Sequence, residues 1–138
     1  MPRNLLADAV WRQLSALVMD NRDTWRRTVI AATGLPFSRI RILRRLARKP
    51  MTVKQIAETA AMDAPAATVA VNDLEQRGLV LRRVDPENRR RKLVSLTAAG
   101  CKVVALVEAV DYPAPAWMEK LSEAELTALR DLMDRLGN

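Results

Sequence analysis

The sequence predicts a mainly α-helical protein with one small β-hairpin near its middle. Most of the chain carries apolar residues at the spacing of about 3.6 residues that is typical of helices. The exception is residues 79–97, where two short runs rich in Val and Leu flank a polar turn. With 138 residues, the chain can bury one core but not two, so a single domain spanning residues 1–138 is expected.

Residues 5–33 are predicted to form one long helix, which Gly34 ends as a C-terminal cap. A helix of about thirty residues is longer than one small core usually needs, so part of its surface is expected to pack beyond the domain. Polar Asn21 interrupts an otherwise apolar stripe. The apolar positions are Leu6, Val10, Leu14, Leu17, Val18, Trp25, Val29 and Ala32.

The second predicted helix begins at Pro36 and ends before Lys49-Pro50. Its expected inner face consists of Phe37, Ile40, Leu43, Leu46 and Ala47. Four arginines fall outside this stripe: Arg41, Arg44, Arg45 and Arg48. They indicate either a solvated helix surface or contacts to a nucleic-acid backbone, and Arg41 and Arg45 are candidates for the latter.

A helix-turn-helix is predicted for residues 52–77. Thr52 and Gln55 have the spacing of a capping box, and Asp63 can cap the following helix after a three-residue turn. Gly78 ends that second helix, whose inner face is expected to be Ala67, Ala70, Val71 and Leu74. Its outer face, which can enter a DNA major groove, carries Ala64, Ala66, Thr68, Val69, Asn72 and Asp73.

A β-hairpin follows at once, with strands at 79–84 and 92–97 around a loop containing Pro86 and Asn88. Its tip and second strand carry four consecutive cations, Arg89, Arg90, Arg91 and Lys92. A basic hairpin alone indicates either contact with a polyanion or a solvated turn. Helix-turn-helix shapes alone are also common. Together in this order they predict a winged helix over residues 36–97.

The C-terminal part is predicted to contain two more helices. Thr97 can cap a helix that begins at Ala98, Pro113 and Pro115 break it, and Ser122 starts the last helix. The apolar residues of that last helix are expected to point inward: Leu126, Leu129, Leu132, Met133 and Leu136. Residues 5–33 and 98–136 therefore flank the winged lobe with long apolar faces, which predicts a homodimer; packing within one chain is the alternative.

Charge is concentrated in two spans. The net charge is +7, and residues 39–49 and 82–92 together hold 12 of the 23 basic and 2 of the 16 acidic residues. The rest of the chain carries 11 basic and 14 acidic residues, a net charge of −3. A basic zone on a mildly acidic body is typical of nucleic-acid binding. A membrane-surface patch is disfavoured because the neighbouring apolar residues have the spacing of a core.

Several function classes are disfavoured by composition. There is no His, and Cys101 is the only cysteine, which removes the usual metal ligands and the commonest general base. No Gly-rich phosphate loop is present. We therefore expect no enzyme activity and no cofactor. Without an apolar leader or a span long enough to cross a bilayer, a cytoplasmic location is expected.

The segment LEQRGLVLRRVDPENRRRKLVSLTAAG resembles the MarR family of winged-helix transcriptional regulators. Gly34-Leu35 followed by Ile42-Leu43 and Leu46 is similar to the entry of the family's second helix. The resemblance implies a homodimer on a pseudo-palindromic operator, joined through its terminal helices. It also implies that small anionic or aromatic ligands, or cysteine oxidation, release the DNA.

The resemblance assigns roles to individual residues. Arg90 matches the wing arginine expected in the minor groove, Arg89 and Arg91 are basic neighbours, and Thr68 matches a recognition-helix threonine. Three positions depart from the family pattern: Asn88 replaces a usual Asp, and Val69 and Asp73 stand where arginines are common. Ala66, Thr68 and Val69 could still meet thymine methyl groups, and Asn72 could pair with adenine.

The sequence therefore predicts a dimeric, sequence-specific regulator that binds double-stranded DNA, by family habit a repressor. The alternative is a winged helix that has lost specific DNA binding and serves as a protein-interaction module. Trp11, Trp25 and Phe37 are candidates for an effector pocket, although large aromatics in helices are commonly core residues. Cys101 is either an inert packing residue or an oxidant sensor.

Overall fold

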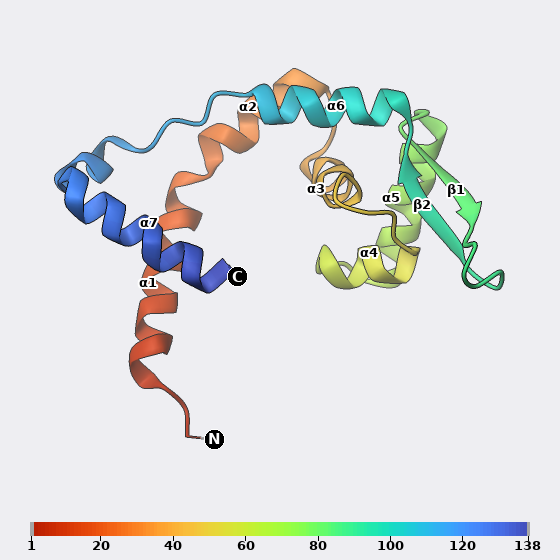
Figure 1. The fold of residues 1–138 in the computed structure, drawn as a ribbon. Coiled ribbons are helices and arrows are strands. Elements are labelled where there is room, and N and C mark those ends of the chain that lie inside the picture. Colours follow the sequence, from red (N-terminus) through yellow and green to blue (C-terminus); the bar gives the residue numbers. More distant parts are fainter. Residues whose placement is uncertain (1, 138) are drawn as a thin grey trace.

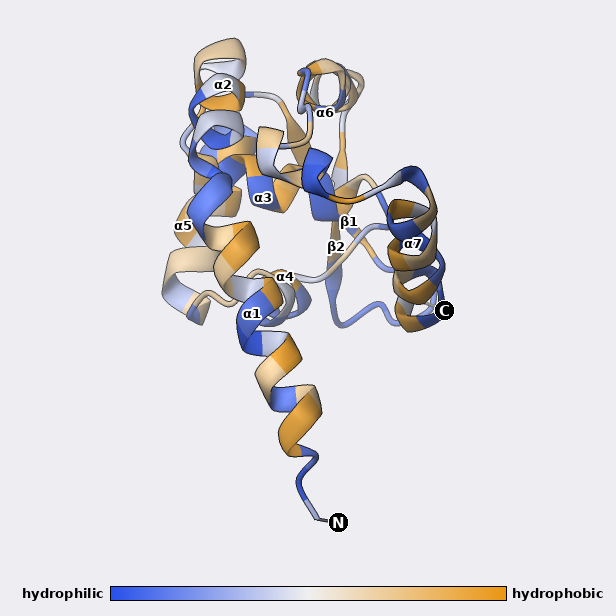
Figure 2. Cartoon of the chain, turned by 90° about the vertical axis from the view of Figure 1, so that its left-hand side faces the viewer, coloured by the Kyte–Doolittle hydropathy of each residue, from blue (hydrophilic) through white to orange (hydrophobic). Residues whose placement is uncertain are grey.

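The computed structural model describes residues 2–137 and has a winged lobe from which two terminal helices project (Figure 1). The projecting helices are α1 (Leu5–Asn21) and α7 (Glu123–Gly137); they overlap in the view of Figure 1 but lie apart in that of Figure 2. The other elements are α2 (Asp23–Thr33), α3 (Phe37–Leu46), α4 (Val53–Thr59), α5 (Ala64–Gln76), β1 (Val80–Val84), β2 (Lys92–Leu96), α6 (Ala98–Ala109) and the short 3₁₀ helix η1 (Ala116–Lys120). The mainly helical fold with one hairpin is confirmed.

The first helical segment is two helices, so the prediction of one long helix over residues 5–33 was wrong. The break lies at Arg22, between α1 and α2. The Asn21 side chain donates to the Leu17 carbonyl (Nδ2–O 2.7 Å), and such a bond offers the backbone an alternative to the regular helix. Asp23 in the first turn of α2 favours a new helix start, since a carboxylate is stabilised at a helix N-terminus.

The hydrophobic core lies within the segment from α2 to α6. All four residues predicted for the inner face of α5 are buried: Ala67, Ala70, Val71 and Leu74. On α3, the predicted Ile40, Leu43 and Leu46 are buried and Phe37 is half-buried, but Ala47 is exposed and Ile42 is buried instead. Ala47 follows the last residue of α3, so it lies beyond the helical face to which the periodicity assigned it.

Side chains fix the boundaries of the helix-turn-helix as the sequence predicted. The backbone amide of Thr52 donates to Gln55 Oε1 (2.9 Å), and that of Gln55 donates to Thr52 Oγ1 (3.1 Å), which completes the capping box. Asp63 accepts the Ala66 amide at the start of α5 (2.7 Å). Between the helices, Ala61 has a positive φ of 52°, a conformation that non-glycine residues rarely adopt.

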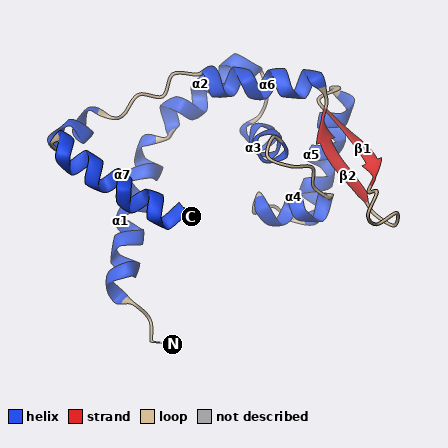
Figure 3. Cartoon of the chain, in the orientation of Figure 1, coloured by secondary structure: helices blue, strands red, loops and turns tan. Residues whose placement is uncertain are grey.

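The hairpin is a two-stranded antiparallel sheet with Val80 opposite Leu96 and Val84 opposite Lys92 (Figure 3). Met51, just before α4, pairs with β2 through an isolated bridge: the Met51 amide donates to Val94 O (3.1 Å), and the Val94 amide to Met51 O (2.7 Å). The wing is therefore hydrogen-bonded directly to the segment that opens the helix-turn-helix.

The terminal helices contribute no buried residue to this chain, within the residues described. Figure 2 shows apolar bands along both α1 and α7. The leucines and Met133 of α7 that were expected to point inward are half-buried at Leu126 and Leu129 and exposed at the other three positions. None of the helices within residues 2–137 has the length and apolar character required to span a membrane.

Candidate nucleic-acid interface

The outer face of α5 presents a small, mostly uncharged surface. Thr68, Val69 and Asn72 are exposed, and Ala66 is half-buried. The Thr68 hydroxyl donates to the carbonyl of Ala64 (3.0 Å), so its methyl group is free to turn outward. These four residues are the ones that the sequence placed on a recognition helix, and the structure gathers them on one side of α5.

Asn72 is held by the wing. Its Oδ1 accepts a hydrogen bond from Arg82 Nη2, and Arg82 lies on β1. The Nε of Arg82 lies 3.8 Å from Glu75 Oε2, one turn further along α5. Arg82 thus joins the hairpin to the exposed side of the recognition helix, a contact that the sequence pattern did not reveal.

Asp85 anchors the loop of the hairpin. Its side chain is almost fully buried; Oδ1 accepts the Glu87 amide (2.9 Å), and Oδ2 accepts Arg91 Nε (2.7 Å). The Glu87 amide, and after it the Arg91 guanidinium, lower the pKa of the Asp85 carboxyl below its ordinary value. Sequence reasoning missed this residue, although Asp followed by Pro is a signature of a turn closed by the Asp side chain.

Asn88 organises the backbone at the tip of the hairpin. Asn88 Oδ1 accepts the backbone amide of Arg90 (3.1 Å) rather than its guanidinium, so Asn88 shapes the turn and does not hold the arginine side chain. The carboxylate that holds an arginine is Asp85, and that arginine is Arg91. Within residues 2–137, the side chains of Arg89 and Arg90 are exposed and form no hydrogen bond or ion pair.

The arginines of α3 make contacts inside the chain. Arg41 Nη2 donates to the Ala60 carbonyl (2.9 Å), and Arg45 Nε donates to the Thr59 carbonyl (3.0 Å). These are backbone carbonyls at the end of α4, which otherwise lack partners. Burial, and after it the neighbouring arginines, lower the pKa of Arg45. Both arginines therefore support the helix-turn-helix, and a phosphate contact would compete with these bonds.

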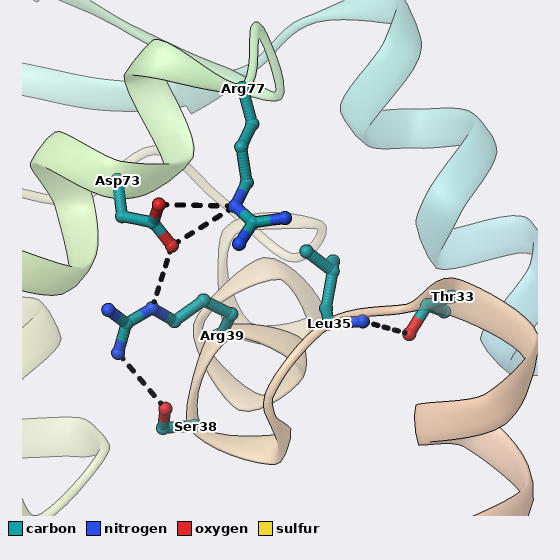
Figure 4. A network of polar contacts seen from close by, with 6 residues as sticks. All are labelled: Thr33, Leu35, Ser38, Arg39, Asp73 and Arg77. Carbon is teal, nitrogen blue, oxygen red and sulfur yellow. Dashed lines mark hydrogen bonds and ion pairs between the residues drawn. The ribbon is translucent and has the colours of Figure 1, made fainter.

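Asp73, where the family commonly has an arginine, faces α3 (Figure 4). Its Oδ2 accepts Arg39 Nε (3.1 Å), and both of its oxygens accept Arg77 Nε at 3.1 Å. The hydrogen bonds from Arg39 and then Arg77 lower the pKa of Asp73. Two cations thus neutralise this carboxylate, and it does not add an isolated negative charge to the surface of α5.

A cavity of about 630 Å³ lies between α2, α3 and the end of α6. Its lining combines aromatic rings with cations: Val18, Arg22, Trp25, Arg26, Phe37, Arg41, Arg44, Arg45, Val107, Glu108, Val110 and Tyr112. The rings of Trp25 and Phe37 meet edge to face (centroids 5.9 Å apart), and Arg44 lies over Trp25 (5.0 Å). The structure thus brings together two of the three predicted pocket residues. Trp11 does not join them; it is 69% exposed on α1.

The remaining candidate groups are Cys101 and the residue types that could bind a metal ion. Cys101 is exposed on α6, so it is not an inert residue packed in the core. No three His, Cys, Asp or Glu side chains within residues 2–137 come together in a way that could hold a metal ion.

Comparison with known proteins identifies relatives over most of the chain. A family model described as MarR family matches residues 33–91. A putative transcriptional regulatory protein for the hcr operon of Thauera aromatica is 32% identical over 113 residues, which cover 80% of this chain and 68% of that protein. The transcriptional regulator HosA of Escherichia coli O111:H- is 29% identical over 136 residues, covering 96% of this chain and 98% of HosA.

The fold is also found among solved structures. The apo structure of Escherichia coli MarR aligns with a TM-score of 0.71 at 17% identity, covering 99% of this chain and 98% of MarR. The alignment spans nearly the whole chain, so the winged lobe and the terminal helices together have the fold of that protein. The chain belongs to the MarR family of transcriptional regulators.

Proposed function

We propose that the protein is a dimeric, sequence-specific repressor that binds double-stranded DNA and is released from it by a small ligand. The observation that carries the proposal is the hairpin tip, where the exposed side chains of Arg89 and Arg90 have no partner within residues 2–137. A guanidinium at the end of a hairpin can enter a minor groove, where A·T-rich DNA has a strong negative potential. The exposed face of α5 would then lie in the neighbouring major groove.

The homodimer is proposed from the apolar side chains that the terminal helices leave exposed. Leu5 and Leu6 of α1 are 75% and 74% exposed, and Leu136 of α7 is 80% exposed. A soluble monomer rarely leaves such apolar faces uncovered, and a second copy offers the same faces for a twofold contact. Twofold symmetry would place two recognition helices on a pseudo-palindromic operator.

The effector is proposed to be a small aromatic anion that binds in the cavity beside Trp25 and Phe37. Five arginines line that cavity, and Glu108 is the one acid among the lining residues. Aromatic rings and guanidinium groups together suit a ligand with a flat apolar part and a negative charge. Trp11 does not line this cavity within one chain, so it could contact the effector only through the second copy of the proposed dimer.

Residues of α3 could couple ligand binding in the cavity to DNA binding. Arg41 and Arg45 line the cavity and also hold the last carbonyls of α4. An anion that drew these two guanidinium groups toward itself would weaken the end of α4, immediately before the turn at Ala61 that leads into α5. Ligand binding and DNA binding would then be coupled through the same two side chains.

A second candidate function is a protein-interaction module that has lost specific DNA binding. The observation that favours it is the composition of the exposed α5 face, where Val69 stands in place of a base-reading arginine and Thr68 uses its hydroxyl within the helix. The basic hairpin tip favours DNA over this alternative, since clustered cations on one face are typical of binding to a phosphate backbone. A cytoplasmic location is part of the proposal for the DNA-binding regulator, because such a protein acts where the chromosome lies.

The deciding experiment is the selection of bound fragments from genomic DNA by the full-length protein. We expect enrichment of a pseudo-palindromic motif, which the matched double variant Arg89→Ala/Arg90→Ala should no longer enrich. Recovery of fragments without any common motif by the parent protein would favour the interaction module. For the ligand, aromatic carboxylates should release the selected DNA from the parent protein in a competition titration.

A further inference from the structure

We infer that Arg82 fixes Asn72 as a hydrogen-bond donor toward the DNA, so that Asn72 selects guanine rather than adenine. The inference rests on the proposed function, because it names a base-reading residue of the same α5 face. Asn72 is exposed, and it follows Thr68 and Val69 at the helical spacing of three to four residues, opposite the buried side of α5. It therefore presents an amide group on the surface that would enter the major groove.

The orientation of the Asn72 amide follows from the chemistry of its partner. A guanidinium group has five N–H donors and no acceptor, so the atom of Asn72 that faces Arg82 has to be the carbonyl oxygen, Oδ1. The NH₂ group at the other branch of the amide then points away from β1. As long as Arg82 is bound, it holds Oδ1 toward β1 and engages one of its two lone pairs, so the outward side of Asn72 presents the NH₂ donor.

This orientation decides which base fits. An asparagine recognises adenine through two bonds, accepting from N6 and donating to N7, and the first of these needs an outward-facing oxygen, whereas Arg82 holds Oδ1 toward β1. Guanine presents two acceptors, N7 and O6, to the major groove, and both suit an outward NH₂ group. Cytosine presents a donor there, which would oppose the NH₂ group. The earlier expectation that Asn72 pairs with adenine is therefore replaced by a preference for guanine.

The position of Arg82 is set by its surroundings on the hairpin. Its side chain is 26% exposed, and its Nε is buried without a hydrogen-bond partner, with Glu75 Oε2 at 3.8 Å. The guanidinium thus lies between two residues of α5, Asn72 and Glu75, which are separated by one helical turn. Arg82 is a positioning residue: it acts on the DNA through Asn72.

Two variants test whether the orientation of the Asn72 amide, and not merely the Asn72 side chain itself, sets the base preference. Asn72→Asp keeps a partner for Arg82 but presents an acceptor outward, so the preferred base at one position of each half-site should change from guanine to cytosine. Arg82→Met removes the donors while keeping an apolar stem of similar length, and it also removes the buried unpartnered Nε. The freed amide of Asn72 should then favour adenine over guanine at that position by roughly tenfold relative to the parent.

The matched control is Arg83→Met, because Arg83 is an exposed arginine of the same strand that makes no contact to Asn72 within residues 2–137. It should lower affinity about equally for all sequences and leave the base pattern unchanged. Each protein is used to select binding sites from a randomised DNA library, after its helical signal and melting temperature have been compared with the parent.

The outcomes distinguish this inference from the proposed function. A parent protein that enriches no motif overturns the proposed function, and the inference with it. A parent motif that Asn72→Asp and Arg82→Met both leave unchanged, or weaken equally at every position, overturns the inference alone and makes Asn72 a phosphate contact or a structural residue. A change of base confined to one symmetric position per half-site supports it.

Discussion

Arg89 and Arg90 are neighbours at the hairpin tip, and replacing each by Ala is expected to affect DNA binding differently. Asn88 fixes the backbone amide of Arg90, which sets the direction in which that residue leaves the turn. Arg90→Ala should weaken binding to the selected operator by roughly tenfold or more, and most at A·T-rich positions. Arg89→Ala should weaken binding about equally for operator and scrambled DNA, because phosphate contacts carry no sequence information.

The measurement is a titration of both variants with the operator and with a scrambled duplex at one salt concentration. The ratio of the two affinities reports specificity. A minor-groove role for Arg90 is untenable if Arg90→Ala loses no more of this ratio than Arg89→Ala does.

Asp85 is expected to make the stability of the wing depend on pH. Its pKa is lowered in the folded protein by the Glu87 amide and by Arg91. A group whose folded pKa lies below its unfolded value contributes stability above the unfolded pKa, near 4 for Asp. That contribution is lost as the pH falls through the lower, folded pKa.

The variant Asp85→Asn should therefore be less stable than the parent at pH 7, and the difference should shrink as the pH falls below about 4. Urea unfolding at several pH values measures it. Glu87→Gln is the control, since the Glu87 side chain is exposed and has no partner within residues 2–137. A gap between Asp85→Asn and parent that stays constant over this range would show that the carboxylate charge is not what anchors the loop.

At the scale of the elements, α6 can pack on the hairpin only because its first turn contains Gly100. A Cβ built at Gly100 would lie 2.1 Å from the Leu79 carbonyl oxygen and 3.2 Å from Leu96 Cδ2. The nearest of these is a backbone atom, so α6 and the start of the hairpin would have to separate. Thr97, whose hydroxyl caps α6 and donates to Gly78 O (2.7 Å), would lose its geometry as well.

Gly100→Ala is accordingly expected to destabilise the protein by roughly 1–3 kcal/mol, the usual cost of overpacking. Gly137→Ala is the matched control, because a Cβ there meets nothing within 4 Å. Urea unfolding of both variants gives the comparison. Equal stabilities for the two would mean that α6 shifts without cost.

How far the sequence could predict these elements depended on whether the signal was local. The capping residues Thr52, Asp63 and Thr97 act within a few positions of themselves, and all three caps were correctly assigned. The break at Arg22 was missed because a single polar residue, Asn21, is a weak signal against a continuous periodicity. Ile42 was left out of the predicted inner face of α3, because that helix is covered on more than one face.

The candidate site was less predictable than the fold, for the same reason. The residues of the α5 face and the tip arginines follow from helical spacing and from the hairpin pattern. The partners that decide their chemistry lie 6 to 34 positions apart in sequence, as in the pairs Asp85–Arg91, Asn72–Arg82 and Arg39–Asp73. The periodicity of the sequence does not encode such pairs. Asp85–Arg91 forms when the hairpin closes, and the other two pairs form when α5 packs against the hairpin and against α3.

At the scale of the whole molecule, the proposed dimer is tested by truncation before Pro113. This change removes α7, which supplies no buried residue to the chain's own core among those described. We expect the winged lobe to keep its helical signal while the dimer is lost, leaving a monomer or an aggregate. Analytical ultracentrifugation measures the outcome, with a chain lacking only residues 137–138 as control. An intact, soluble dimer after truncation would place the interface elsewhere.

Salt dependence tests whether the basic zone as a whole faces DNA. If arginines of both protomers neutralise phosphates, the logarithm of affinity should fall with the logarithm of salt concentration by roughly 0.9 for each phosphate contact. Arg89→Ala should reduce that slope, by about two contacts per dimer, one from each protomer. A nearly flat dependence in the parent protein would contradict the assignment of these cations to DNA.

The separation between the buried core, which runs from α2 to α6, and the exposed helices α1 and α7 has a consequence for evolution. Substitutions on α1 and α7 leave the stability of the winged lobe nearly untouched, since no buried core side chain is altered. If α1 and α7 form the proposed dimer interface, two copies could stop pairing with each other after a gene duplication, long before the proposed DNA-reading surfaces diverge. The specificity of pairing can therefore change by successive substitutions, and the winged lobe of each intermediate protein still folds.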